Sequence, residues 1–210
     1  MLLKGICLEA AEVNFVCPCD NCDCAEVFAA YVSEGAWNND NVVASLSSDP
    51  IGTYVLKGKM DADVFAKVKT NIEAAKAVKN FRTVAVHGKF FANSGSSIVQ
   101  ELAFSLAQGA EYLTQLTEAG LSIDDAARSM KFNFGISNNY FMEIAKLRTA
   151  RLLLSKIVEA YAPECTCSAK LIAHSETNRY NKTVYDPYVN MLRTQTEAMS
   201  AVLGGAHSIT

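Results

Sequence analysis

Short apolar runs alternate with longer amphipathic runs along the whole chain, and this alternation predicts an α/β protein with a parallel sheet. Each predicted strand is brief and is bounded by Gly, Asn, Ser or Asp. The predicted strands are residues 6–10, 42–46, 83–87, 132–136 and 170–173. Strand–helix units in this order build either a doubly wound open sheet or a (βα)₈ barrel. A complete barrel takes about 250 residues and eight strands, so a barrel formed from this chain would be incomplete.

Two helices are predicted by apolar residues that recur three and four positions apart. The first carries Phe65, Val68, Ile72, Ala75 and Val78, and the second carries Val99, Leu102, Leu106, Gly109, Leu113 and Leu116. Ser97 and Gln100 have the spacing of a capping box at the start of the second helix, and Gly120 is suited to end it in a left-handed conformation.

Two more helices are predicted in the C-terminal part of the chain. Asn138 is a candidate cap for a long helix that starts at Asn139 and ends before Pro163. The pair Asp186–Pro187 favours a helix start, and the glycines at 204 and 205 favour its end.

The bulk composition is that of a globular protein with one core, so we expect residues 1–210 to form a single domain. The 210 residues are 50% hydrophobic with a formal net charge of −3. The sequence has no basic stripe that would attract nucleic acid and no apolar stretch near the roughly 20 residues of a membrane span. The first residues lack the pattern of a signal peptide, which favours a cytoplasmic location.

Four of the seven cysteines form a CxCxxCxC cluster, and Cys165 and Cys167 form a second close pair. The cluster consists of Cys17, Cys19, Cys22 and Cys24. Thiolates at this spacing could bind Zn²⁺ or another soft metal. Four thiols within eight residues crowd one turn, however, so ordinary reduced cysteines are the preferred interpretation and no metal ligand is assigned.

Several long runs in one continuous order resemble the methylmalonyl-CoA mutase family. The most specific are residues 139–151 (NYFMEIAKLRTAR) and residues 186–205 (DPYVNMLRTQTEAMSAVLGG). Residues 99–104 (VQELAF) and 174–183 (HSETNRYNKT) extend the resemblance, which covers roughly residues 81–210. The resemblance implies part of a (βα)₈ TIM-type substrate barrel, with about five βα units.

The family resemblance also implies a reaction and a cofactor. Members are adenosylcobalamin-dependent isomerases of propionate metabolism that interconvert methylmalonyl-CoA and succinyl-CoA, with the CoA tail passing through the barrel. The cofactor supplies the radical, and the protein supplies binding, orientation and water exclusion. The DxHxxG motif that ligates cobalamin does not occur in this sequence. We therefore expect adenosylcobalamin to be bound by a partner or by a further domain, and not by these residues.

Most positions that match catalytic residues of the family carry side chains of the wrong chemistry. Phe90 stands where the register places the acid that hydrogen-bonds the thioester carbonyl, and a phenyl ring has no proton to donate. His87 lies three positions away, and we expect its side chain to project elsewhere. Ser129 and Lys131 occupy the places of an Arg-x-Ser pair that contacts CoA. We therefore assign no catalytic residue.

Two positions are candidates for substrate binding. His174 matches a CoA-contacting histidine of the catalytic chains, and Glu176 replaces a nearby glutamine. An ionised Glu176 cannot donate a hydrogen bond and would repel anionic CoA, so we interpret His174 as a remnant of the shared barrel.

These substitutions indicate a non-catalytic, small-type subunit that pairs with a catalytic large subunit in a heterodimer. Two other interpretations stay open: a catalytically active CoA-ester mutase barrel, and a Cys-rich metal-binding α/β domain. An incomplete barrel leaves sheet edges and apolar surface uncovered, so we expect the isolated chain to self-associate.

Overall fold

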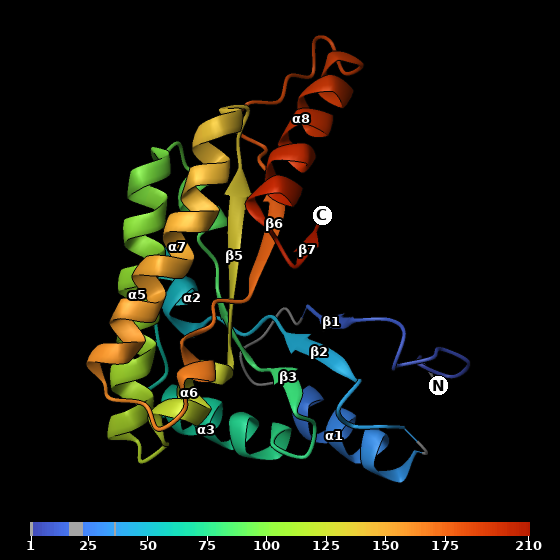
Figure 1. Cartoon of the computed structure of the whole chain (residues 1–210), viewed down its shortest axis with the longest axis vertical. Helices are drawn as coiled ribbons and strands as arrows, with labels where there is room; N and C mark the ends of the chain where they lie inside the picture. Colours follow the sequence, from blue (N-terminus) through green and yellow to red (C-terminus); the bar gives the residue numbers. More distant parts are fainter. Residues whose placement is uncertain (1, 17–22, 36) are drawn as a thin grey trace. The chain divides into compact units, whose positions relative to one another are not determined.

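The computed structural model describes residues 2–16, 23–35 and 37–210, and these residues fall into two compact units. The first unit comprises Met1–Ala85 and Gln115–Met130, and the second comprises Val86–Thr114 and Lys131–Thr210. Figure 1 shows the whole chain, coloured by sequence from blue at the N-terminus to red at the C-terminus.

The first unit contains a three-stranded parallel sheet in the order β1-β2-β3. Its strands are β1 (Val13–Phe15), β2 (Val43–Leu46) and β3 (Asn80–Arg82). Four helices complete the unit: α1 (Cys24–Glu34), α2 (Pro50–Lys57), α3 (Val64–Ala75) and α6 (Ile123–Arg128). Buried apolar side chains of β2, β3, α1 and the end of α3 form its core, with Phe28 of α1 packed edge-on against Phe81 of β3.

The second sheet has four strands in the order β4-β5-β6-β7. The strands are β4 (Val84–Val86), β5 (Met130–Ile136), β6 (Ala173–Thr177) and β7 (Ser208–Ile209). β5 pairs with β6 in parallel with Asn133 beside His174, and β6 pairs with β7 in parallel with His174 beside Ser208. This register places the side chains of Asn133, His174 and Ser208 in one row across the sheet.

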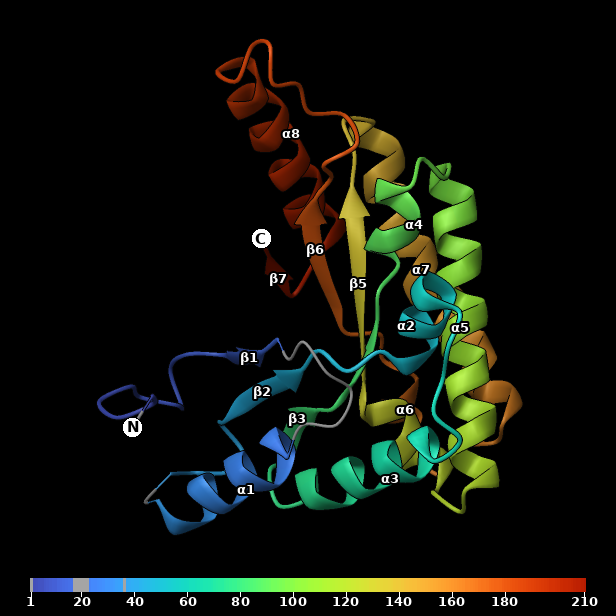
Figure 2. The same ribbon diagram turned by 180° about the vertical axis from the view of Figure 1, so that it is seen from behind.

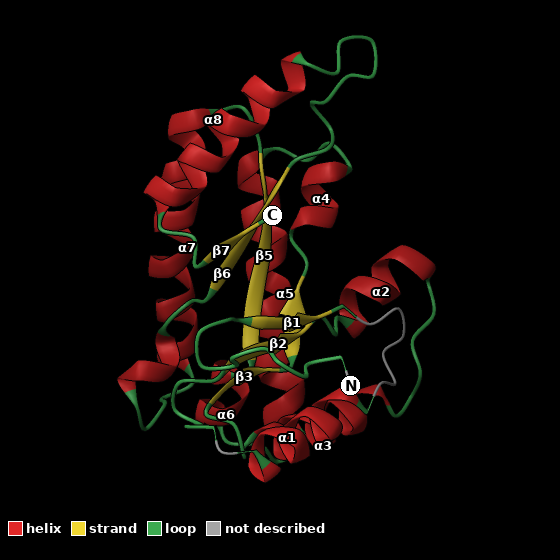
Figure 3. Ribbon diagram, turned by 90° about the vertical axis from the view of Figure 1, so that its right-hand side faces the viewer, coloured by secondary structure: helices red, strands yellow, loops and turns green. Residues whose placement is uncertain are grey.

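Helices cover one face of the second sheet, as Figures 2 and 3 show for α5 and α7 behind β5. The helical elements are α4 (Lys89–Asn93), α5 (Ile98–Glu118), α7 (Tyr140–Ala160), the 3₁₀ turn η1 (Thr166–Ala169) and α8 (Val189–Gly204). Two glycines allow close packing here. A Cβ on Gly109 of α5 would come within 2.8 Å of the Phe132 ring, and one on Gly204 of α8 would come within 2.6 Å of Leu147 of α7.

The predicted α/β class with parallel sheets is confirmed, whereas closure of a barrel is not shown. The predicted strands at 42–46, 83–87 and 132–136 are β2, β4 and β5. The strand predicted at 6–10 is wrong, because residues 6–7 have no regular structure, residues 8–10 form a turn, and the strand lies at Val13–Phe15. The strand predicted at 170–173 shares only Ala173 with β6. The single-domain expectation for residues 1–210 stays a prediction.

The helix signals were correct at some ends and wrong at others. The capping box is confirmed, since Ser97 N–H donates to Gln100 Oε1 (2.9 Å) and Gln100 N–H donates to Ser97 Oγ (3.3 Å). Gly120 and Gly205 both have a positive φ, at 88° and 81°. The cap predicted at Asn138 is wrong, because Asn139 precedes α7 and makes no side-chain cap bond.

The last helix also begins later than predicted. α8 starts at Val189, after a turn, so Asp186 is not its cap. The Asn190 side chain bonds both the N–H and the carbonyl of Thr183 and thereby fixes the loop that precedes the helix.

A fully buried lysine ties α5, β5 and α7 together. Lys146 Nζ lies 2.6 Å from a carboxylate oxygen of Glu101, 2.6 Å from one of Glu143 and 2.5 Å from the carbonyl oxygen of Gly135. Glu101 also accepts from Gly135 N–H (2.7 Å), and Glu143 accepts from Ser137 N–H (2.9 Å). Both buried carboxylates therefore have the ammonium group of Lys146 as their counter-charge.

Among the helices that the structure describes, none combines the length and the apolar character needed to cross a bilayer.

Replacing Lys146 with Met should destabilise the chain strongly. The substitution leaves the carboxylates of Glu101 and Glu143 buried without a counter-charge, which costs about 3–5 kcal/mol when one partner of a buried pair is removed. Urea unfolding followed by circular dichroism measures the change. Lys156→Met is the matched control, because Lys156 is exposed on the same helix and its loss should stay within about 0.5 kcal/mol. A loss below about 1 kcal/mol for Lys146→Met would contradict the role given to this cluster.

Candidate functional site

One face of the second sheet carries a row of polar side chains on β5 and β6. β5 alternates Lys131, Asn133 and Gly135 with Phe132, Phe134 and Ile136, all of them buried. In β6 the side chains of His174 and Glu176 follow the same face as Asn133, because Asn133 pairs with His174 and Gly135 with Glu176. Strands of a parallel sheet are usually apolar on both faces. A row of His, Asn, Lys and Glu side chains is therefore unusual on a parallel sheet, and this face is the candidate site.

His87 follows β4 and lies on this polar face. Its Nδ1 accepts a hydrogen bond from the Asn133 side-chain amide at 2.8 Å. Its ring centroid is 5.0 Å from that of Phe90, in α4. The expectation that His87 projects away from the Phe90 position is therefore wrong, since the two rings are neighbours.

Burial keeps the His87 ring neutral. Desolvation, with smaller contributions from the charges of Lys89 and His174, lowers the pKa of His87 to about 4, and the opposing charge of Glu176 is too weak to restore it. Because Nδ1 is engaged as an acceptor, the proton of the neutral ring is on Nε2. His87 is therefore a neutral imidazole near neutral pH and cannot act there as a cation.

Lys89 and Glu176 neutralise each other at the carboxyl end of the sheet. Lys89 Nζ lies 2.5 Å from Glu176 Oε2, and Arg179 lies 3.4 Å from Glu176 Oε1. Burial opposes ionisation of Glu176, but the hydrogen bond and charge of Lys89, with Arg179 and His174, outweigh it and lower the pKa of the carboxyl group. Glu176 is thus a carboxylate that is already bound to a cation of this chain.

His174 is also engaged within the sheet, because its Nδ1 lies 2.9 Å from Ser208 Oγ of β7. The sequence prediction placed His174 and Glu176 together, and the structure brings both to the polar face with His87 and Asn133. Sequence reasoning missed Asn133 and Lys89 as members of this cluster. The signal for Asn133 was present, as a polar residue inside an otherwise aromatic strand.

The two residues at the Arg-x-Ser positions, Ser129 and Lys131, lie in different surroundings. Ser129 Oγ donates to the carbonyl oxygen of Ala126 (2.8 Å) at the end of α6, so this hydroxyl serves local structure. Lys131 lies in β5 and is 95% buried, with 5% of its surface exposed.

A hollow of about 540 Å³ opens at the carboxyl edge of the second sheet. The loops after β5 and β6 and the start of α5 line it, with Ser97, Asn138, Asn139, Asn178 and Tyr180 among its residues. Ligands of parallel α/β sheets bind at this edge, where βα loops follow the strands. Amide and hydroxyl side chains line it together with apolar ones such as Ile98 and Met142, and the carboxylates of Glu101 and Glu143 are among its residues.

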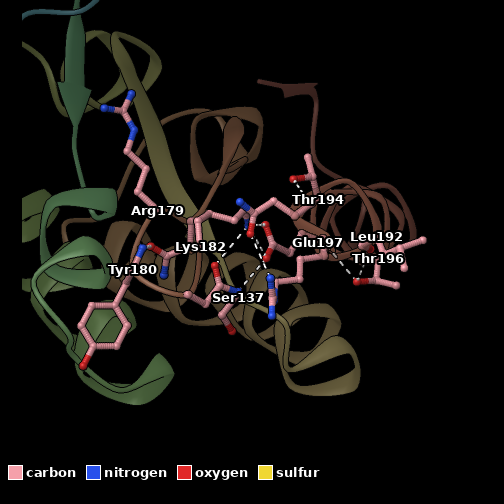
Figure 4. A network of polar contacts seen from close by, with 12 residues as sticks. Ser137, Arg179, Tyr180, Lys182, Leu192, Thr194, Thr196 and Glu197 are labelled. Carbon is pink, nitrogen blue, oxygen red and sulfur yellow. Dashed lines mark hydrogen bonds and ion pairs between the residues drawn. The ribbon is translucent and has the colours of Figure 1, made fainter. Parts of the chain in front are cut away.

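The loop after β6 is held to α8 by a buried carboxylate. Lys182 Nζ lies 2.6 Å from both oxygens of Glu197, and Asn181 donates to Glu197 Oε1 at 2.7 Å. Figure 4 shows these groups converging on Glu197, whereas the Tyr180 ring points away from them. The loop that lines the hollow therefore has a fixed base.

The structure describes only some of the cysteines considered in the sequence. Cys17, Cys19 and Cys22 lie outside the described residues, and Cys24 begins α1. Within the ranges the structure describes, no group of three or more His, Cys, Asp or Glu side chains is arranged to hold a metal. The prediction of reduced thiols is wrong for Cys165 and Cys167, which form a disulfide. The reason is proximity, since the loop holds their Cα atoms 5.2 Å apart.

Hydrogen bonds orient all three histidine rings of this chain. The sequence has three, and the Nδ1 atoms of His87, His174 and His207 are bonded to Asn133, Ser208 and the Ala173 N–H respectively. Nδ1 of His87 and of His207 accepts a hydrogen bond, so Nε2 of each neutral ring carries the proton and has no lone pair for cobalt, and no reaction step is assigned to adenosylcobalamin here.

Known proteins resemble this chain over its whole length. The small subunit of methylmalonyl-CoA mutase from Porphyromonas gingivalis is 41% identical over 211 residues, covering 100% of this chain and 34% of that protein. Methylmalonyl-CoA mutase from Rhizobium meliloti is 44% identical over 219 residues, covering 100% of this chain and 30% of that protein. The mitochondrial human mutase is 38% identical over 152 residues, covering 72% of this chain and 20% of that protein.

The chain spans about a third of the length of the curated relatives it matches. Residues 1–210 match the family model described as methylmalonyl-CoA mutase. The parallel α/β units, the polar row across the second sheet and this full-length match lead to one conclusion: the chain belongs to the methylmalonyl-CoA mutase family.

Proposed function

We propose that the chain is a segment of a non-catalytic small subunit of methylmalonyl-CoA mutase. Its role is structural: it pairs in the cytoplasm with a catalytic large subunit, which isomerises methylmalonyl-CoA and succinyl-CoA. The observation that carries this proposal is the 41% identity of the entire chain to a protein named as the small subunit.

The geometry of the polar face supports the non-catalytic role. Phe90 stands where the resemblance expects the acid that hydrogen-bonds the thioester carbonyl, and the Ser129 hydroxyl donates to a carbonyl at the end of α6. Glu176 is a carboxylate bound to Lys89, so the two groups satisfy each other rather than a substrate. Ser129 and Glu176 are thus engaged within the chain, and Phe90 has no proton to donate, so none of the three is suited to an acid–base step.

A catalytically active barrel is the second candidate, and two observations favour it. The Rhizobium meliloti relative, 44% identical, is named as the mutase without reference to a small subunit. The imidazole ring of His87 lies beside Phe90, the position at which the resemblance places the acid that contacts the thioester carbonyl. Turnover by this chain separates the two candidates.

The cofactor belongs to the assembled enzyme in this proposal. Adenosylcobalamin would supply the radical chemistry when bound, and its ligand would come from the partner or from a domain outside residues 1–210. The three histidines of this chain keep their rings bonded inside the second unit.

The pairing can be tested by co-expression with a catalytic large subunit of the family. We expect the two chains to elute together in size-exclusion chromatography, because the uncovered sheet edges and apolar surface need a partner. We also expect no conversion of methylmalonyl-CoA by the purified chain with adenosylcobalamin present. The large subunit measured alone and in the mixture is the control. Turnover by this chain without the large subunit would contradict the proposal and favour the active barrel.

The neutral state of His87 predicts a specific pH dependence of stability. The unfolded chain takes up a proton on His87 below its ordinary pKa of 6.5, whereas the folded chain does so only near pH 4. Stability is therefore fully present above pH 6.5 and is lost as the pH falls toward 4, by about 2 kcal/mol between pH 6.5 and 5. Urea unfolding across this range should show a shallower slope for His87→Gln, which keeps a side-chain acceptor for Asn133. Equal slopes for the two proteins would show that His87 is not held neutral.

A further inference from the structure

Two cysteines outside the polar face are joined in the loop that follows α7. Cys165 and Cys167 form a disulfide across a single intervening residue, Thr166. Both cysteines are half-buried, so solvent and small reagents can reach the loop. Neither residue has a part in the polar row of the second sheet.

The loop is anchored on both sides independently of this bond. Before it, the Tyr161 hydroxyl lies 2.8 Å from Thr114 Oγ1 of α5. After it, Ser168 and Leu171 are buried at 2% and 3% exposure. Within it, the Cys167 N–H donates to Cys165 Sγ at 3.3 Å. These contacts keep the two sulfur atoms close together whether or not the bond between them is formed.

A structural role for the bond is weak. Disulfides stabilise a fold mainly by restricting the unfolded chain, and the effect shrinks with the length of the loop they close. Here the loop contains three residues, while α7 and β6 are held by their own buried side chains, such as Val158 and Ala173. The bond therefore restricts little that the fold does not already restrict, and its exposure makes it the kind of disulfide that takes part in exchange.

We propose that Cys165 and Cys167 are a thiol–disulfide exchange site, opened by a dithiol reductant and closed by a disulfide oxidant. In the opening reaction a thiolate of the reductant attacks one of the two sulfurs, and the other cysteine leaves as a thiolate. The second thiol of the reductant then attacks the mixed disulfide and releases the first cysteine. Two electrons and two protons pass to the cysteine pair, and the reductant becomes a disulfide. This proposal does not depend on the proposed function.

The sequence offers a direct way to follow this pair alone. Cleavage after Lys156 and Lys170 releases residues 157–170 (IVEAYAPECTCSAK), which contain no other cysteine. The folded chain is equilibrated with oxidised glutathione or with dithiothreitol, alkylated, digested and weighed. We expect the peptide to be about 2 Da lighter than its dithiol form, without alkylation, after oxidation and to carry two alkyl groups after reduction. Circular dichroism should be the same in both states.

Three results would overturn the proposal. A peptide with two alkyl groups after oxidation shows that the bond does not form. A bridged peptide after dithiothreitol, or loss of helical signal on reduction, shows a structural disulfide instead. As the matched control, Cys24→Ser should leave the transition of this peptide unchanged, whereas Cys165→Ser should leave Cys167 carrying one glutathione.

Discussion

The second unit depends on one buried ammonium group, that of Lys146. It lies between the carboxylates of Glu101 and Glu143 and also bonds the carbonyl oxygen of Gly135. The cost of burying these charges is offset only because each has partners in good geometry. Burial raises the pKa of Glu101, while the charge and hydrogen bond of Lys146 act in the opposite direction. The cluster joins two long helices to the central strand at the end where that strand leaves the sheet.

The placement of this cluster determines what the carboxyl edge can present. Glu143 holds the N–H and hydroxyl of Ser137, the first residue after β5, so the loop that lines the hollow starts from a fixed point. On the opposite face of β5, Asn133 holds His87, and Lys89 holds Glu176. The polar row is therefore largely bonded within itself. Because the charged groups of this face are committed to each other, few are left to act on a substrate, which is the physical basis for the proposed non-catalytic role.

The sequence was sufficient for the long elements and for the polar positions of β6. The periodic apolar residues of α3, α5 and α7 and the aromatic run of β5 identify these elements because each buries a continuous face. β1, β3 and β7 have two or three residues each, too few for a periodic signal, and they exist because a neighbouring strand pairs with them. The disulfide was missed because proximity across Thr166 depends on the loop's conformation. His174 and Glu176 were found through resemblance, whereas Asn133 and Lys89 become visible only when the register of β5 and β6 is known.

The most direct test of the central claim is the mutase turnover of an assembled heterodimer that carries changes in the polar face of this chain. His174→Asn and Glu176→Gln keep the size of each side chain and remove its ionisable group, and co-elution with the large subunit verifies assembly. If this chain is non-catalytic, turnover with methylmalonyl-CoA stays within about twofold of the unmodified enzyme, a change of less than about 0.5 kcal/mol in the activation barrier. A loss of about a hundredfold or more in an assembled variant would contradict the account and place these residues in the reaction.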